Sequence, residues 1–240
     1  MTTQHLPGTN AARHGTGDAD LTIMIAGHDA FRRDVIRLAR AASAANDPSR
    51  RQSVQAGWEL FKRQLHMHHT AEDKIIWPTL RPRLAHSAAA LSVLDAMEAE
   101  HELIDPLLAA VDGAFARQEP PAAVIDALTS TLTGHLAHEE RDGLPLIGVA
   151  LTAAEWRRAG RKIASRNGLS AGAEMFAWIL DGAGPDRTAA TLGQLPPPVR
   201  LLYRTRWKPR FDKTPLVTRP APPAELRASC RTKRGACLRS

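Results

Sequence analysis

The sequence is poor in cysteine, in aromatic residues and in long apolar runs, and each shortage excludes a class of protein. Its two cysteines, Cys230 and Cys237, both lie near the C-terminus, which excludes a disulfide framework and a four-cysteine zinc site. Aromatic residues make up only 5%, and Ala and Leu supply most of the apolar content, which favours helices over sheets. No apolar run approaches the roughly 18–20 residues of a transmembrane helix, so no membrane partner is expected.

The N-terminal stretch also lacks a targeting pattern. Residues 1–20 are polar and contain no basic start followed by an apolar segment, so we expect no signal peptide and a cytoplasmic location. Positive charge is concentrated at the other end: residues 196–240 carry a net +10 and the first 195 residues a net −3. Such a tail can touch nucleic acid, but a solvated extension is the favoured interpretation.

Four long segments have apolar residues at helical spacing, at about 21–45, 48–79, 87–117 and 122–142. Short links between long amphipathic helices are typical of an antiparallel up-down-up-down four-helix bundle, so the predicted fold class is all-α. Two shorter helices are expected at 152–167 and 169–182. The predicted organisation is a disordered N-terminus (1–18), the bundle (19–148), a helical C-terminal extension (149–211) and a basic tail that we expect to be disordered (212–240).

Polar residues interrupt the apolar stripe of every predicted bundle helix. The second stripe continues from Leu65 into His68 and Glu72, and the fourth from Leu132 into His135 and Glu139. The first and third helices contribute one histidine each, and the full set is His28, His68, Glu72, His101, His135 and Glu139. Burying these groups without partners would cost several kcal/mol for a carboxylate alone, so they need a common reason.

A pair of divalent cations supplies that reason, because neutral imidazoles donate nitrogen lone pairs and two carboxylates offset the positive charge. The His and Glu of each pair are four residues apart, which places both on one helix face. At about 1.5 Å per residue, three of the helices bring these groups to one level, roughly 10 Å from a predicted helix end. His101 falls roughly 20 Å from its predicted helix start, so the third helix should begin later than residue 87, or bend at Pro106.

The pattern of His28, His68-His69-Thr70-Ala71-Glu72-Asp73, Glu100-His101-Glu102 and His135-Leu136-Ala137-His138-Glu139-Glu140 resembles the hemerythrin family, also called the HHE cation-binding domain. The likeness covers about residues 21–147. It implies a four-helix bundle that holds two iron ions, with manganese or zinc also compatible with such ligands. It further implies dioxygen, peroxide or nitric oxide as the small exogenous ligand.

One departure from the family pattern bears on function. Oxygen-carrying hemerythrins have a fifth histidine one turn before the third-helix ligand, and here that position is Met97. The alternatives that stay open are binding or sensing, a di-iron enzyme acting on peroxide or as an oxidase, and a regulatory interaction protein. No nucleophilic triad or phosphate loop occurs, so no catalytic residue is assigned.

Four residues next to the predicted ligands are also polar, and we expect other roles for them. His69 and His138 lie off the apolar stripes, and we expect solvated histidines at both positions. Asp73 and Glu140 follow the two glutamate ligands directly, and they are candidates for hydrogen bonds that orient the histidines.

Overall fold

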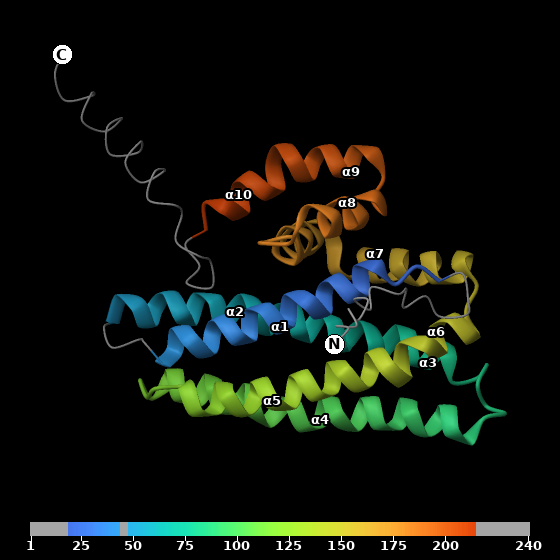
Figure 1. Cartoon of the computed structure of the whole chain (residues 1–240), viewed down its shortest axis with the longest axis horizontal. Coiled ribbons are helices and arrows are strands. Elements are labelled where there is room, and N and C mark those ends of the chain that lie inside the picture. The colour runs from blue at the N-terminus through green and yellow to red at the C-terminus, as the bar shows by residue number, and fades with distance from the viewer. Residues whose placement is uncertain (1–18, 44–47, 215–240) are drawn as a thin grey trace, which may run out of the picture.

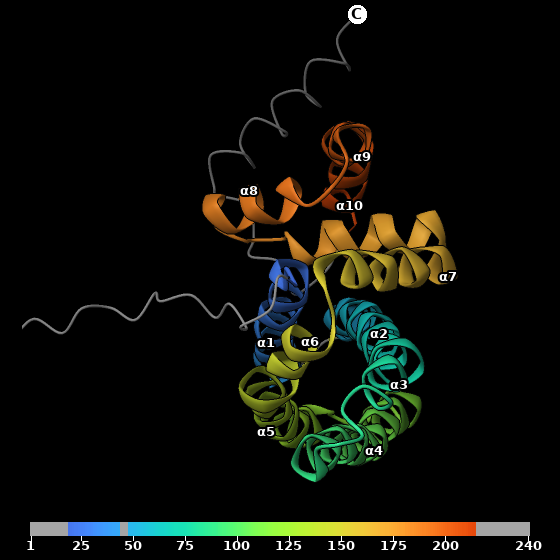
Figure 2. The same ribbon diagram turned by 90° about the vertical axis from the view of Figure 1, so that its right-hand side faces the viewer.

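The computed structural model describes residues 19–43 and 48–214, and within these ranges the regular elements are all helical. Helices α1 (Thr22–Ser43), α2 (Pro48–Ala71), α4 (Ala88–Ala116) and α5 (Ala122–His138) form an antiparallel four-helix bundle. Viewed from the end in Figure 2, these four helices form a closed ring. The predicted fold class is therefore confirmed. The disorder predicted for 1–18, most of the basic tail and both cysteines lie outside the described residues.

The predicted helix starts agree with local capping chemistry. The side chain of Ser87 accepts a hydrogen bond from the backbone N–H of Ala90, which satisfies one free donor at the start of α4. Pro121 precedes α5, where a missing N–H does no harm. Because α4 begins at Ala88, the suggestion of a later start is wrong. The error came from assuming that the helix ends are level.

Two π-helical segments extend the bundle helices beyond the glutamates. Segment η1 (Glu72–Ile76) connects α2 to α3 (Trp77–Leu80), and η2 (Glu139–Gly143) connects α5 to α6 (Leu144–Ala150). The backbone N–H of Trp77 donates to the carbonyl of Glu72, and that of Leu144 to the carbonyl of Glu139, so each bond spans five residues. A proline comes next, and it lacks an N–H and crowds the carbonyl four residues back. The fourth helical run therefore continues to Ala150 instead of ending at about residue 142.

The interior of the bundle consists of two apolar clusters with a polar layer between them. The large apolar cluster includes Phe31, Trp58, Phe61, Leu65, Ile104, Leu128, Leu132 and Leu136. The small apolar cluster includes Ile76, Trp77, Leu80, Leu94, Met97, Leu144 and Ile147. Between them, every bundle helix carries buried or partly buried histidines and glutamates. This polar layer contains His28, His68, His69, Glu72, His101, His135 and Glu139.

The C-terminal extension packs on the bundle beside α1 and α2 (Figure 2). It contains α7 (Ala153–Ile179), α8 (Pro185–Gly193), α9 (Pro197–Leu202), π-helical η3 (Tyr203–Trp207) and α10 (Lys208–Asp212). Gly168 interrupts α7 with a φ of 79°, so α7 is two helical pieces joined where the sequence predicted a break. Helix α8 was not predicted.

The extension is fastened to α1 through two adjacent charged residues. The guanidinium of Arg33 donates to the carbonyls of Trp178 (3.0 Å), Ile179 (3.3 Å) and Asp181 (2.6 Å), which belong to the end of α7 and the turn after it. Carbonyls at a helix end lack partners within the helix, and a cation there also opposes the negative end of the helix dipole. The buried carboxylate of Asp34 accepts from Trp178 Nε1 at 2.7 Å. Both contacts place α7 against the helix that carries His28.

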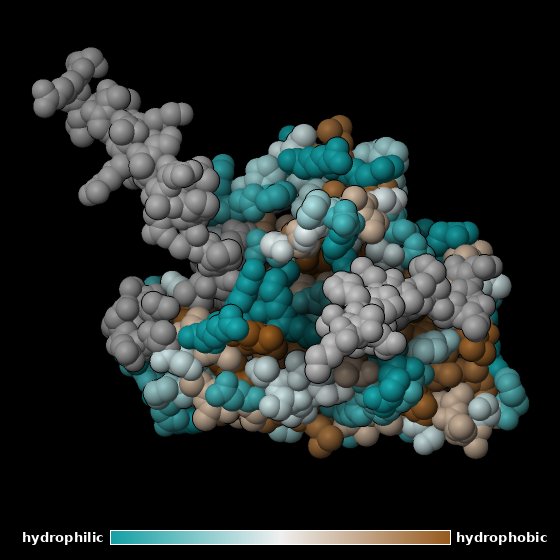
Figure 3. Space-filling model, viewed as in Figure 1, coloured by the Kyte–Doolittle hydropathy of each residue, from teal (hydrophilic) through white to brown (hydrophobic). Residues whose placement is uncertain are grey.

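Hydrophilic side chains predominate over α8–α10 and the adjoining part of α1 on the face shown in Figure 3, with some apolar side chains among them. Residues 149–214 contain 12 Lys and Arg against 5 Asp and Glu, whereas residues 19–148 contain 13 against 18. The excess of positive charge therefore begins in the extension, before the basic tail.

None of the helices in the described ranges is long and apolar enough to cross a membrane.

Candidate metal centre

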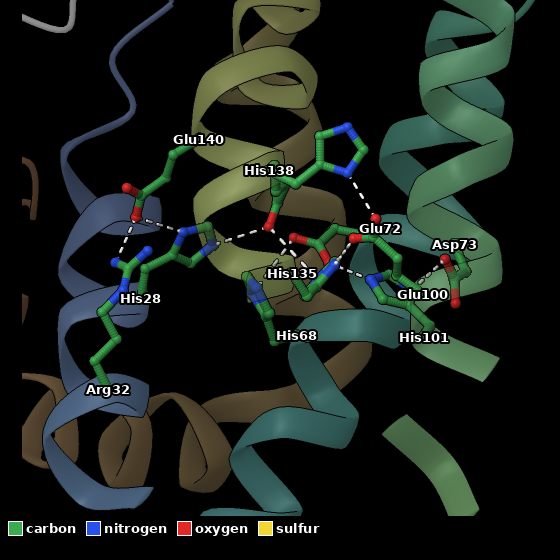
Figure 4. Close-up of polar contacts among 11 residues, drawn as sticks. His28, Arg32, His68, Glu72, Asp73, Glu100, His101, His135, His138 and Glu140 are labelled. Atoms are coloured by element: carbon green, nitrogen blue, oxygen red, sulfur yellow. Dashed lines mark hydrogen bonds and ion pairs between the residues drawn. The ribbon is translucent and has the colours of Figure 1, made fainter. Parts of the chain in front are cut away.

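All six predicted ligands lie in the polar layer, and each bundle helix contributes (Figure 4). His28 comes from α1, His68 from α2, His101 from α4 and His135 from α5, while Glu72 and Glu139 are the first residues of η1 and η2. All are buried except the side chain of His68, which is 13% exposed. The structure thus brings together the residues that the interrupted stripes predicted.

The layer divides into two groups of potential ligand atoms. One group contains His28, His68, Glu72 and Glu139, and the other contains His69, His101 and His135. Within each group, one donor atom from every residue lies within 4.8 Å of the others. Each group has the dimensions of a site for one cation.

His69 contradicts the prediction of a solvated side chain. It is 7% exposed, and its ring stacks on His101 with centroids 3.9 Å apart and planes 11° apart. The apolar stripe of α2 did not indicate a buried His69, because adjacent residues lie about 100° apart around a helix. A helix that packs between two other helices can point two consecutive side chains into the interior, and α2 contacts both α1 and α4. The only available signal was the pair of consecutive histidines.

Potential metal-donor atoms that have no hydrogen-bond partner are concentrated in this layer. Among the described residues, 13 buried side-chain nitrogen or oxygen atoms have no hydrogen-bond partner, and nine of them belong to this layer. These nine are Nε2 of His28, His68, His69, His101 and His135, and both carboxylate oxygens of Glu72 and Glu139. The closest His–Glu approaches, from 3.2 Å (His28 to Glu139) to 3.9 Å (His135 to Glu139), lack hydrogen-bond geometry. Folded proteins leave few buried polar atoms unpaired, so this concentration of them is what a cation-binding centre without its ions would show.

Without a metal ion, the two carboxyl groups of the layer have pKa values shifted in opposite directions. Burial raises the pKa of Glu72 well above its usual value, and the neighbouring Glu139 carboxylate raises it further. Burial also pushes the pKa of Glu139 upward, but the contact with His28 and the charges of His28, His135 and His101 together outweigh burial and lower this pKa to about 2. Burial, reinforced by neighbouring histidines, lowers the pKa of His68 and His69 well below the usual value. These two imidazoles are therefore neutral, the form that binds metals.

Three histidines of the polar layer each have their Nδ1 atom beside a carboxylate that lies outside the layer. The Nδ1 atoms of His101, His28 and His135 lie 2.9, 3.1 and 2.8 Å from Asp73, Glu140 and Glu100 respectively. An ionised carboxylate can only accept, so each Nδ1 carries a proton, and Nε2 of the neutral imidazole is the nitrogen that faces the interior with a lone pair. The structure places Asp73 and Glu140 as predicted.

Glu100 was missed because its role depends on a contact between α4 and α5, which sequence spacing does not reveal. Its second oxygen accepts from Nδ1 of His138 at 2.6 Å, and the side chain of His138 is 26% exposed. His138 is therefore a partly buried member of this network, and not the freely solvated histidine that was predicted. The network connects His135 with the protein surface.

Met97, at the position of the family's fifth histidine, belongs to the small apolar cluster and is fully buried. A Cβ atom added to Gly143 would lie 3.4 Å from Met97 Sδ and 3.2 Å from Glu139 Cγ. The small residue at position 143 thus leaves room for Met97 beside the glutamate.

The fold and the layer together define a class, namely a helical bundle with an internal cation-binding centre built from histidine and glutamate. The model of the hemerythrin HHE cation binding domain matches residues 19–147, and the chain belongs to this family. No curated protein and no solved structure matches the chain. The match covers the four bundle helices and the π-helical segments η1 and η2, and it ends before α7.

The donor set fits metal ions of the kind that this family binds. Imidazole nitrogen and carboxylate oxygen suit iron, manganese and zinc, and the layer offers both types. Each of the two groups has the size of a cation site, and both glutamates belong to the group that contains His28 and His68.

Proposed function

We propose that the chain is a hemerythrin-like non-haem di-iron protein that binds or senses dioxygen, peroxide or nitric oxide at its metal centre. The single observation that supports this most is the convergence of nine orphaned donor atoms in one buried layer of a hemerythrin-family bundle. Five of these donors are imidazole nitrogens and four are carboxylate oxygens. A mixed set of this kind suits iron, with manganese or zinc as the alternatives.

The surrounding residues have defined roles in such a centre. Iron would supply reversible redox chemistry and affinity for small exogenous ligands. The bonds from Asp73, Glu100 and Glu140 orient the imidazoles, so that little rearrangement is needed when a cation binds. The apolar clusters on both sides exclude water from the layer.

Metal content and absorption of anaerobically purified protein test this proposal. We expect two irons per chain and a near-ultraviolet band that appears when the protein meets air or peroxide. Nitric oxide added to the reduced protein should give a separate spectrum. Protein that takes up zinc but no iron, or no metal at all, would contradict the proposal.

A second candidate function is an enzyme that consumes peroxide. The hydrogen-bonded contacts from the partly exposed His138 through Glu100 to His135 favour it, because turnover needs a route for protons between solvent and the centre. Iron-loaded protein mixed with peroxide should then evolve oxygen continuously, and His101→Ala should abolish this. A single stoichiometric colour change without turnover would favour binding or sensing.

A third candidate is a sensor whose C-terminal extension responds to the centre. Phe31 contacts both parts, since its ring lies 5.1 Å from His68 and 4.9 Å from Trp178, measured between centroids. A shift of His68 would therefore reach α7 through one aromatic ring. Hydrogen exchange in 153–212 should change on metal binding, and Phe31→Leu should remove that change. Exchange that does not respond to metal would rule this candidate out.

A further inference from the structure

The two halves of the polar layer repeat the same arrangement. Segments α2–η1 and α5–η2 each carry a histidine, then a glutamate four residues later, then a second acid. On one side His101 approaches Glu72 through Nε2 (3.5 Å) and Asp73 through Nδ1 (2.9 Å). On the other side His28 approaches Glu139 (3.2 Å) and Glu140 (3.1 Å) through the same two atoms. These four contacts correspond between the two halves.

The correspondence fails at one position, the residue directly after the first histidine of each segment. This residue is His69 on α2 and Leu136 on α5, and both side chains are buried. Leu136 packs in the large apolar cluster. His69 instead stacks on His101, lies edge-on to His135 at 5.6 Å between centroids, and leaves Nε2 without a partner.

A buried imidazole costs more than a leucine if its only task is to fill space. Its polar atoms lose water, and an unpaired one carries the full desolvation penalty. The other orphaned Nε2 atoms on this side belong to His101 and His135, and a ring nitrogen of His69 lies within 4.8 Å of a ring nitrogen of each. A cation among these three nitrogens would satisfy all of them at once.

We infer that His69 is a fifth histidine ligand, so that one ion has three imidazole donors and the other has two, from His28 and His68. This inference rests on the proposed function, because it assigns a ligand of the same centre. The third-helix position that is Met97 here would then be replaced by a donor from a different helix, α2. The two ions would then have unequal surroundings, because the ion beside α1 has fewer imidazole donors and lies with the two glutamates.

The inference is tested by titrating Fe(II), under anaerobic conditions, into the full-length metal-free protein and into two variants. His69→Phe keeps a planar ring to stack on His101 but removes the nitrogen. His66→Phe is the matched control, since His66 is an exposed histidine on the same helix. We expect two ions per chain for the wild type and the control. In His69→Phe the second ion should bind at least about 10- to 100-fold more weakly, the range typical of losing a mere supporting contact.

A second readout separates a ligand from a residue that only packs. In protein loaded with Co(II), His69→Phe should show one fewer hyperfine-shifted imidazole N–H resonance than the wild type. If His69→Phe does not fold, His69→Leu takes its place, because leucine occupies the matching position at 136.

The outcomes distinguish the two proposals. Two ions bound with unchanged affinity by the variant, and an unchanged set of shifted resonances, would overturn the role of His69 and leave the di-iron proposal intact. A wild-type chain that binds no iron would overturn the di-iron proposal itself.

Discussion

The polar layer and the two apolar clusters lie on the same bundle helices, yet different interactions hold them together. The apolar clusters are stabilised by burial of side chains such as Phe61 and Leu94, which need nothing from outside the chain. The polar layer is equally buried, but its donor atoms lack partners within the protein. The apolar clusters therefore stabilise the bundle by themselves, whereas the polar layer has hydrogen bonds, among the described residues, only on its outer side, at Nδ1 of His28, His101 and His135.

The largest expected effect comes from the apolar side of this comparison. Phe61 is fully buried between Phe31 and Trp58, with centroids 5.8 Å from each. Phe61→Ala should lower the free energy of unfolding by about 3–5 kcal/mol. Chemical denaturation with excess metal and with a chelator should give the same loss. A loss seen only in the presence of metal would mean that the two regions are not separate.

The opposite sign is expected in the polar layer. Replacing Glu72 and Glu139 together by leucine removes two buried carboxylates, and it should stabilise the metal-free protein by about 1–4 kcal/mol. The same variant should bind no metal, so the wild type should regain the advantage once metal is added. Denaturation curves with and without metal measure both effects.

Glu102→Leu is the control for that pair, because Glu102 is an exposed glutamate on α4. It should leave both stability and metal binding unchanged. A destabilised metal-free double variant would show that the carboxylates already support the layer without cations.

A smaller effect is expected at the rim of the layer. Glu100→Gln weakens the acceptors for His135 and His138 and should reduce metal affinity by about 10- to 100-fold. Glu98→Gln serves as the control, since Glu98 lies on the same helix with a 40% exposed side chain paired to Arg81. Competition with a metal-binding dye measures the affinities. Equal values for the two variants would remove the orienting role of Glu100.

The smallest effect belongs to the extension. Thr152 and Glu155 form a reciprocal capping pair at the start of α7. Thr152→Ala should cost about 1 kcal/mol of stability. Metal affinity should stay at the wild-type value, because the side chains of Thr152 and Glu155 bond to each other and to Arg83, and not to the polar layer. Thermal unfolding and metal titration of the same sample test both statements, and a changed affinity would contradict the second.

The sequence predicted most of the bundle because its helices follow a simple period. It also predicted which six side chains converge in the polar layer, since a charged or imidazole side chain in an apolar stripe is conspicuous. His69 could not be predicted in this way, because periodicity selects one face of a helix and α2 directs two faces inward. Glu100 was missed because its contacts cross between helices. Helix α8 was missed because its nine residues hold few apolar positions, and packing against α1 stabilises it.

The π-helical segments change the phase of the helices that contain them. Up to the glutamates, the inward positions follow spacings of three and four, as in Leu65, His68, Glu72 on α2. A regular helix would continue through Ile75 to Thr79, but Thr79 is exposed and Leu80 is buried instead. On α5 the shift brings Gly143 and Ile147 inward, in place of Asp142 and Leu146. Each wide turn holds one extra residue, so the chain beyond the layer is rotated by one position. The polar layer is therefore the boundary between two registers, and deleting one residue from either turn would rotate the small apolar cluster's side chains away from the core.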